Sequence, residues 1–168
     1  MRTIPLVTLE QLQAASTDEA LIVFVTVSHE AIEAPIRLVL DHADYLRDGA
    51  LYRAAPFRLD LVNDDERPPR ARFSFPAVNR EALTRLAAVS APARVDCEIL
   101  AAASFDLGVN PRQEKPGAIP IYAARHLFLT DVSLDAAQCS GALRGWDYRQ
   151  ELWPNVLATQ ALTPGLWP

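Results

Sequence analysis

The segment ALIVFVTVSHEAIEAPIRLVLDH, residues 20–42, decides the fold class that this sequence predicts. Its first half is rich in β-branched and aromatic side chains, which predicts a buried strand. In its second half Ile36, Leu38 and Leu40 alternate with the residues between them, which is the period of a half-buried strand. The short loop EAIEAP between the two halves predicts that the strands pair antiparallel.

The next part of the chain predicts a turn and a broken strand. The signal RDG at residues 47–49 is typical of a turn. The segment ALYRAAPFRLDL at residues 50–61 comes after it, with Leu51 and Phe57 among its apolar anchors. Pro56 cannot donate a ladder hydrogen bond, so we expect an edge, a bend or a bulge there.

Three later segments also have the character of strands. Residues 70–78, RARFSFPAV, alternate cleanly, and we expect Phe73 and Phe75 to pack against the Ile36–Leu40 face. Residues 93–103 and 119–135 predict further strands. The charged segment just before residue 70, Asn63–Pro69, predicts a solvent-exposed hairpin tip.

Helices are predicted at only two places. Thr8 and Gln11 fit a capping box, which predicts a short helix over Leu9–Ser16. Asn79 can cap a second helix over residues 80–89, whose apolar stripe includes Leu83, Leu86 and Ala87. We expect residues 108–118 to form a loop and the chain after residue 135 to be irregular.

These elements together predict a mainly β (α+β) fold. The expected architecture is a small antiparallel β-barrel or sandwich with one or two short helices. The length of 168 residues fits a single domain, which we place at residues 1–151, with its N-terminal helix. Residues 152–168 are expected to form an extended apolar C-terminal arm.

The arm, LWPNVLATQALTPGLWP, contains no charged residue and no histidine. Its prolines prevent a regular helix, and its two indoles need cover from water. We therefore expect the arm to lie over an apolar surface, partly on a neighbouring protein and otherwise on its own domain. The candidate interface residues are Trp153, Leu157, Leu162, Leu166 and Trp167.

Composition excludes some classes of partner. The net charge is -5 and Lys115 is the sole lysine, which argues against nucleic acid as the main partner. The apolar run LIVFVTV at residues 21–27 is too short to span a bilayer. The N-terminal residues lack the pattern of a signal peptide.

Residues able to hold a metal or act as a nucleophile are scattered. His29, His42 and His126 lie at no metal-ligand spacing to one another or to a cysteine, so we expect no metal. Cys97 and Cys139 are widely spaced, and we interpret them as reduced thiols that act as small apolar groups. There is no nucleophile motif and no phosphate-binding glycine loop, so we expect no cofactor and no enzymatic activity.

Two sets of carboxylate residues could be considered as catalytic or metal sites. Asp96 and Glu98 share one face of a predicted strand and, with Asp106, could be proposed as an acid–base set. Like charges at that spacing usually indicate the solvent face instead. The segment NDDE at residues 63–66 lacks the spaced ligands of a calcium loop.

A small cluster near the C-terminus offers a different kind of site. Trp146, Asp147 and Tyr148 place two large aromatic rings beside a carboxylate, a combination found in sugar and cation sites. The alternative is a packed corner in which Trp146 is buried and Asp147 caps a turn. A ligand-binding or enzymatic barrel with its pocket here is therefore one alternative function.

The order of several elements resembles a known family. They are Ser28-His29 to Leu40, the segment from Gly49 to Phe57, the segment from Arg70 to Arg80, and the terminal Thr163–Trp167. In this order they resemble a family of domains of unknown function found in the tail genes of long-tailed phages and prophages. The match covers most of the chain from Leu21 onward.

The resemblance implies a structural protein of a siphophage tail tip or baseplate. Such a protein is made in the host bacterial cytoplasm and built into the virion tail. The family implies a small β-barrel with a helix, in a homo-oligomeric ring at the distal end of the tail tube. A hexamer is favoured and a trimer is possible. The implied partners are the tail tube, the tape measure and hub or tail-fibre proteins. A further alternative function for this chain is that of a protein adaptor that acts through its C-terminal arm.

Overall fold

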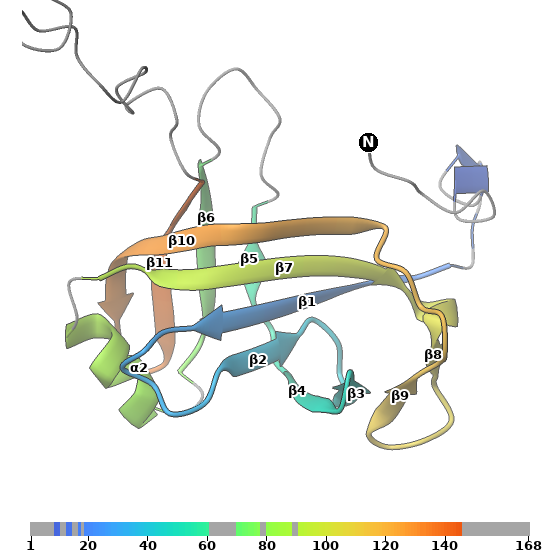
Figure 1. Cartoon of the computed structure of the whole chain (residues 1–168), viewed down its shortest axis with the longest axis horizontal. Helices are drawn as coiled ribbons and strands as arrows, with labels where there is room; N and C mark the ends of the chain where they lie inside the picture. The colour runs from blue at the N-terminus through green and yellow to red at the C-terminus, as the bar shows by residue number, and fades with distance from the viewer. Residues whose placement is uncertain are drawn as a thin grey trace, which may run out of the picture.

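The chain folds into one strongly curved sheet with helix α2 packed beside it, as this computed structural model shows (Figure 1). The structure describes residues 9–10, 13–14, 17, 19–60, 70–77, 80–88 and 91–145. The strands are β1 (Leu21–Ser28), β2 (Ile36–Val39), β3 (Tyr45–Arg47), β4 (Ala50–Ala54), β5 (Arg58–Leu59), β6 (Arg70–Pro76), β7 (Ala93–Ala101), β8 (Phe105–Asp106), β9 (Arg112–Glu114), β10 (Tyr122–Leu134) and β11 (Gln138–Arg144). The helices are α2 (Arg80–Ala88) and the short 3-10 helix η1 (Ala102–Ser104).

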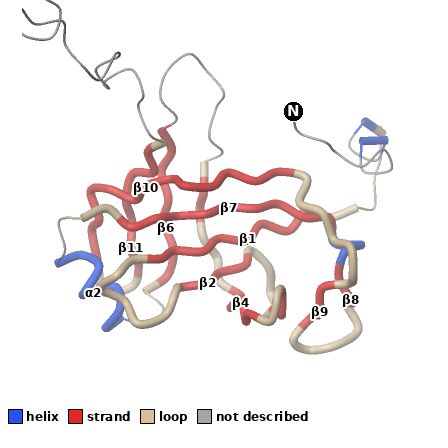
Figure 2. Tube along the Cα trace, viewed as in Figure 1, coloured by secondary structure: helices blue, strands red, loops and turns tan. Residues whose placement is uncertain are grey.

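Strands dominate the described chain (Figure 2), so the predicted mainly β class is confirmed. The strand order in the sheet is β5-β6-β11-β10-β7-β1-β2-β4-β3-β9-β8. The sheet is open, with β5 and β8 as its edges, rather than a closed barrel. It is also mixed rather than wholly antiparallel, since β2 pairs parallel with β4 and β3 pairs parallel with β9. The β3–β4 hairpin causes the first exception, because it returns the chain beside β2 in the same direction.

The curvature of the sheet results from one short connection. Only residues 55–57 join β4 to β5, although these strands lie far apart in the strand order. The sheet must therefore coil until β5 approaches β4. In Figure 1 the strands β5, β6 and β11 accordingly cross behind β10, β7 and β1. The inner faces of these two groups of strands enclose the main core.

The main core brings together the strands whose alternation the sequence displays. Leu38 is fully buried in one cluster with Phe73 and Phe75, as predicted, and Ile36 belongs to the same cluster. The rings of Phe73 and Phe75 stack with 4.8 Å between centroids. Leu40 does not join them, because β2 ends at Val39 and the chain bends. The side chain of Leu40 is 44% exposed, so its predicted place in the core is wrong.

A second, smaller core covers the opposite face of β1 and β2. It consists of Ile22, Phe24, Val39, Tyr45, Leu100 and Phe105. The ring of Phe24 lies 5.3 Å from that of Phe105 and 5.4 Å from that of Tyr45. Burial on both faces explains why the β1 sequence is almost continuously apolar rather than alternating.

The predicted turn after β3 is confirmed, whereas the predicted core role of Leu51, which comes after the turn, is wrong. Asp48 and Gly49 have φ values of 48° and 72°, the left-handed conformation that a two-residue hairpin requires. Leu51 comes after this turn on β4 and is 41% exposed, so it is no core anchor. Tyr52 takes that role, because its ring packs edge-on against Phe24 at 5.2 Å.

Helix α2 forms as predicted, while strands β3, β8, β9 and β11 lie outside the predicted strands. Leu83 and Leu86 are buried in the core, but Ala87 is exposed. Strand β9 lies in the predicted loop, and β11 lies in the region that we expected to be irregular. The β11 sequence QCSGALR is rich in small residues, and Gly141 must be small. A Cβ added there would approach the Leu129 Cδ1 atom to 2.7 Å and the Thr130 carbonyl oxygen to 2.9 Å.

Several predictions fall outside the described residues. They concern the hairpin tip Asn63–Pro69, the cluster Trp146–Tyr148 and the arm from Leu152 to Pro168. Of the predicted Leu9–Ser16 helix, Leu9, Glu10 and Gln13 are helical and others are not described. In the described residues, no helix has the length and apolar character needed to cross a bilayer.

Candidate functional site

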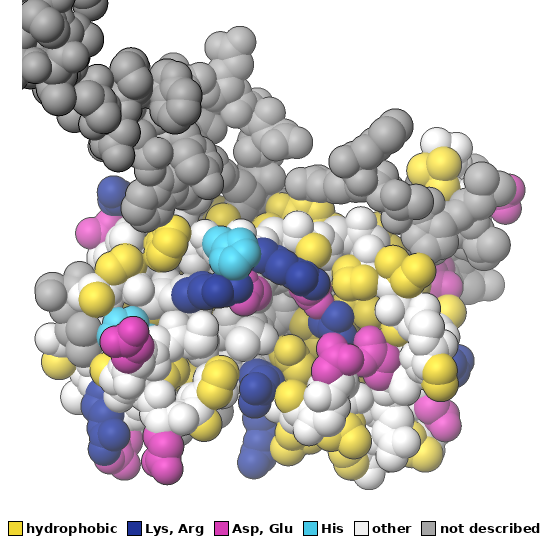
Figure 3. Space-filling model, viewed as in Figure 1, with side chains coloured by type: hydrophobic (Ala, Val, Ile, Leu, Met, Phe, Trp, Pro, Cys, Tyr) yellow, Lys and Arg dark blue, Asp and Glu magenta, His cyan; other side chains and the backbone are white. Residues whose placement is uncertain are grey.

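Charged side chains gather on the outer face of β7 and its neighbours (Figure 3). They surround a hollow of about 240 Å³, which we call the charged groove. Its lining residues are Phe24, Thr26, Arg47, Asp48, Tyr52, Arg94, Asp96, Glu98 and Arg125. Strand alternation explains the position, since Asp96 and Glu98 point outward from β7 while Val95 and Cys97 enter the core.

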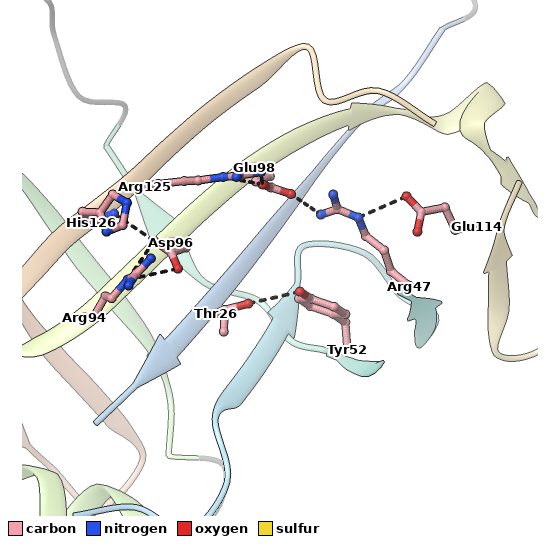
Figure 4. Close-up of polar contacts among 9 residues, drawn as sticks. All are labelled: Thr26, Arg47, Tyr52, Arg94, Asp96, Glu98, Glu114, Arg125 and His126. Carbon is pink, nitrogen blue, oxygen red and sulfur yellow. Dashed lines mark hydrogen bonds and ion pairs between the residues drawn. The ribbon is translucent and has the colours of Figure 1, made fainter. Parts of the chain in front are cut away.

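Arg47, at the end of β3, forms the base of the groove (Figure 4). It is 7% exposed, and its guanidinium binds Glu98 at 2.5 Å and Glu114 at 3.2 Å. The same guanidinium lies 5.4 Å from the centroid of the Phe24 ring. Burial opposes the charge, but the two carboxylates outweigh it and raise the pKa of Arg47. Arg47 therefore ties β3 and β9 to the outer face of β7.

A β-bulge in β10 supplies the opposite wall of the groove. The register with β7 shifts between Ala124 and Leu127, and His126 has a φ of 63°. The His126 backbone N–H donates to the Asp96 carboxylate at 2.8 Å, which stabilises this uncommon conformation. The bulge places Arg125 and His126 together on the outer face of the sheet (Figure 4).

The charges of the groove are layered. Glu98 accepts hydrogen bonds from Arg125 at 2.6 and 3.1 Å, and Asp96 accepts one from Arg94 at 3.4 Å. The Glu98 and Asp96 side chains are 13% and 29% exposed, whereas those of Arg125 and Arg94 are 59% and 46% exposed. The carboxylates are thus the less exposed layer, and the arginines that pair with them are the more exposed one.

Several polar groups of the groove are engaged with one another. Asp96 and Glu98 are ion-paired, and the Thr26 and Tyr52 hydroxyls hydrogen-bond to each other at 3.1 Å. The two thiols lie in the core, where burial raises the pKa of Cys97 to about 12 and that of Cys139 to about 11. Both therefore stay protonated at neutral pH and are poor nucleophiles.

The residues singled out in the sequence are only partly brought together here. Asp96 and Glu98 share one face as predicted, but Glu98 is largely covered rather than solvent-exposed. Asp106 lies elsewhere and accepts a hydrogen bond from the Gly108 N–H at 3.0 Å. In the sequence, no local pattern indicates Arg47, because its partners come from distant strands.

The three histidines lie in different surroundings. His126 belongs to the rim of the groove, while the His29 Nδ1 accepts a hydrogen bond from the Ala31 N–H at 2.9 Å. His42 contacts Asp41 at 2.5 Å and Arg112 at 3.0 Å. Within the described ranges, no group of three His, Cys, Asp or Glu residues is placed to hold a metal ion.

A second polar cluster fixes the β2–β3 connection to β9. Arg112 donates to the Asp41 carboxylate at 2.5 Å and to the Tyr45 hydroxyl at 2.7 Å, while Tyr45 donates to Asp41 at 2.5 Å. Burial and the hydrogen bond to Asp41 raise the pKa of Tyr45 to about 12. Burial disfavours the Asp41 charge, yet the bonds from Tyr45 and the His42 backbone, with Arg112 nearby, lower its pKa overall. This cluster is a structural clamp.

Comparison with known proteins identifies the family. Residues 7–157 match the family described as a domain of unknown function, DUF1833, and the chain belongs to that family. A comparison with curated proteins gives no match.

Proposed function

We propose that this member of the DUF1833 family is a structural component of a siphophage tail tip or baseplate. It forms part of a ring at the distal end of the tail tube and contributes to tail assembly. Six copies are the favoured ring order, and three are the alternative. Its partners are the tube, the tape measure and hub or tail-fibre proteins, and it functions in the virion tail after synthesis in the host cytoplasm.

The resemblance to phage tail domains supports this proposal because it runs along the framework of the fold. Its first element, Ser28–Leu40, covers the loop between β1 and β2 together with β2 itself. Its second, Gly49–Phe57, covers β4 and the connection that coils the sheet. Its third, Arg70–Arg80, covers β6 and the start of α2. The elements thus belong to the framework rather than to isolated loops.

The layered charges of the groove are the observation that carries the proposal. Glu98 lies under Arg125 and holds it through two hydrogen bonds, so less side-chain entropy is lost when a partner binds the arginine. Arginine is enriched at protein interfaces and among the residues that contribute most to binding. A rigid, paired surface of this kind suits a permanent contact in an assembly.

Genetic removal and complementation test the proposal. A phage or prophage whose copy of this gene is deleted should yield defective or incomplete tails by negative-stain microscopy. The wild-type gene should restore infectious tails that contain the protein, as mass spectrometry of purified virions will detect. Infectious, complete tails without this protein would contradict the proposal.

Charge reversal within the groove refines this test. The double variant Arg94→Glu, Arg125→Glu should fold but lose complementation, because it reverses the outward charges. Arg85→Glu on α2 is the matched control, since Arg85 is also ion-paired at 2.6 Å and its side chain is 55% exposed. Equal complementation by both proteins would mean that the groove is no assembly surface.

Truncation before Leu152 examines the predicted arm. A shortened protein that folds as a monomer and no longer assembles would support contacts between neighbouring subunits. Unchanged oligomerisation and complementation would remove the arm from assembly, and failure to fold would indicate that the arm packs on its own domain.

A further inference from the structure

Four side chains of alternating charge form a chain of ion pairs along the charged groove (Figure 4). Glu114 pairs with Arg47 at 3.2 Å, and Arg47 pairs with Glu98 at 2.5 Å. Glu98 in turn pairs with Arg125 at 2.6 Å. The Glu114 end is closed, because its second carboxylate oxygen accepts the Asp48 backbone N–H at 3.2 Å. The other end, at Arg125, has an opposite charge on one side only among the described residues.

The arginines at this open end keep most of their hydrogen-bonding capacity. A guanidinium carries five N–H donors. Arg125 donates two hydrogen bonds, both to Glu98, and Arg94 donates one to Asp96. The described part of the chain supplies no other acceptor for either guanidinium, and both arginines line the groove. Each can therefore donate to a further oxygen ligand.

The bulge in β10 brings the two arginines together at one carboxylate. Arg125 lies inside the register shift, and the next residue, His126, has a φ of 63°. The His126 backbone N–H donates to Asp96, the same carboxylate that accepts the Arg94 bond. Bulges of this kind re-aim side chains, and uncommon backbone conformations cluster at functional sites. The bulge thus assembles a pair of arginines from two adjacent strands.

The size and lining of the groove suit one acidic side chain. Its volume of about 240 Å³ lies below the range of roughly 300–1,000 Å³ that is typical of small-molecule sites. The Thr26 and Tyr52 hydroxyls share one hydrogen bond, so the accepting hydroxyl can donate its own proton to a ligand. A multiply charged phosphate fits less well, since the lining also contains Asp48, Asp96 and Glu98, which repel it.

We infer that the groove binds the carboxylate of an aspartate or glutamate side chain on a partner protein. The guanidiniums of Arg94 and Arg125 donate to this carboxylate, which extends the alternating chain by one member. Arg47 already shows this arrangement, because it is held between two carboxylates. Arginine–carboxylate hydrogen bonds are charge-assisted and about twice as strong as neutral ones. The inference rests on the proposed function, in which the groove is an assembly surface, and it names the chemistry of the partner.

Titration of the purified full chain with a peptide tests this inference. The probe is penta-glutamate with both ends blocked, and blocked penta-glutamine is the uncharged comparison. Binding is followed at low salt through the NMR resonances of the arginine Nε–H groups. We expect saturable shifts of the Arg94 and Arg125 resonances with penta-glutamate and no shifts with penta-glutamine. Added salt should weaken the binding, because it screens exposed charges.

Replacement of the two arginines should weaken binding stepwise. Arg94→Gln and Arg125→Gln should each raise the Kd for penta-glutamate about three- to ten-fold, and the double variant should lose saturable binding. Both side chains are about half exposed, so the variants should keep the fold, which circular dichroism checks. Arg85→Gln is the matched control, because Arg85 is an exposed, ion-paired arginine on α2, and its Kd should be unchanged.

Several results would overturn the inference. Undiminished binding by the double variant, or an equal loss in Arg85→Gln, would place the peptide elsewhere. Equal binding of penta-glutamine would exclude recognition of the carboxylate. Saturation by inorganic phosphate at a lower concentration than by the peptide would assign the groove to a phosphate-bearing ligand.

Failure of this inference can be told apart from failure of the proposed function. If penta-glutamate does not bind but the gene deletion still yields defective tails, the chemistry assigned to the partner is wrong and the role in tails stands. If the peptide binds as expected but tails are complete without the protein, the ligand of the groove stands and the role in tails is wrong.

Discussion

Replacement of Arg47 by alanine should destabilise the fold strongly. Removing one partner of a buried ion pair usually costs about 3–5 kcal/mol, because the other charge remains without compensation. Here Glu98 keeps Arg125 as a partner, and Glu114 has a 16% exposed side chain, so part of the cost is relieved by other contacts and water. The lost contact with Phe24 adds to the cost. We therefore expect a loss of about 3 kcal/mol.

Equilibrium denaturation in urea, monitored by circular dichroism, measures this loss of unfolding free energy. Thermal unfolding, monitored in the same way, measures the change in melting temperature. A chain of this length should show a decrease in melting temperature of about 2–4 °C for each kcal/mol, or roughly 6–12 °C. Arg125→Ala is the matched control, since it removes the other partner of Glu98 but from an exposed position, and should cost less than about 1 kcal/mol. Arg47→Lys should fall between them, because an ammonium cannot reproduce the planar contact with both acids. Equal losses for Arg47→Ala and Arg125→Ala would refute the idea that burial makes Arg47 the centre of the network.

Other predictions concern packing and pH. Gly141→Ala should cost about 1–3 kcal/mol in urea denaturation because its Cβ has no room, whereas Gly108→Ala, where the nearest atom is 3.4 Å away, should be close to neutral; a neutral Gly141→Ala would disprove the close approach. Leu38→Ala should cost about 2–5 kcal/mol and Leu40→Ala less than about 1 kcal/mol, and similar values would contradict their opposite burial. Because the pKa of Tyr45 is raised from 10.0 to about 12, its contribution to stability should be complete below pH 10 and be lost as the pH rises toward 12. A phenolate absorbance titration should show a late transition that Tyr45→Phe removes, and its persistence in that variant would assign it to another tyrosine.

The sequence predicted the strands whose apolar residues alternate or cluster strongly. β1, β2, β6, β7 and β10 were all expected from this signal, and the helix at residues 80–88 from its leucine stripe. The predictions failed where pairing depends on distant partners. β9 is held by a parallel pairing with β3, in which Arg112 lies opposite Tyr45, and its own sequence carries no strand signal. β11 is built from small residues because its partner strand approaches closely at Gly141.

The candidate site was less predictable than the fold. The pattern of β7 does place Asp96 and Glu98 on one face, and it predicts a solvated surface for them. The structure instead covers Glu98 with Arg47, a residue at the end of a three-residue strand. Strand β3 covers the face of β1 and β7 that lies opposite the main core, and this placement depends on strand pairings along the whole chain rather than on a local segment. An ion pair of this kind therefore has no signature in either strand alone.

The bulges of β10 do have a sequence signature, although it differs from the one used to predict strands. In a regular strand, every second residue points toward the core. Along β10 the spacing becomes three between Ala124 and Leu127 and again between Leu129 and Val132, and the strand pairings shift register at the same points. Each interruption contains a residue with positive φ, and the first places Arg125 in the lining of the charged groove and joins the His126 N–H to Asp96. A break of one residue in an otherwise regular alternation, with charged residues inside the break, thus marks where a long strand directs polar groups to a surface site.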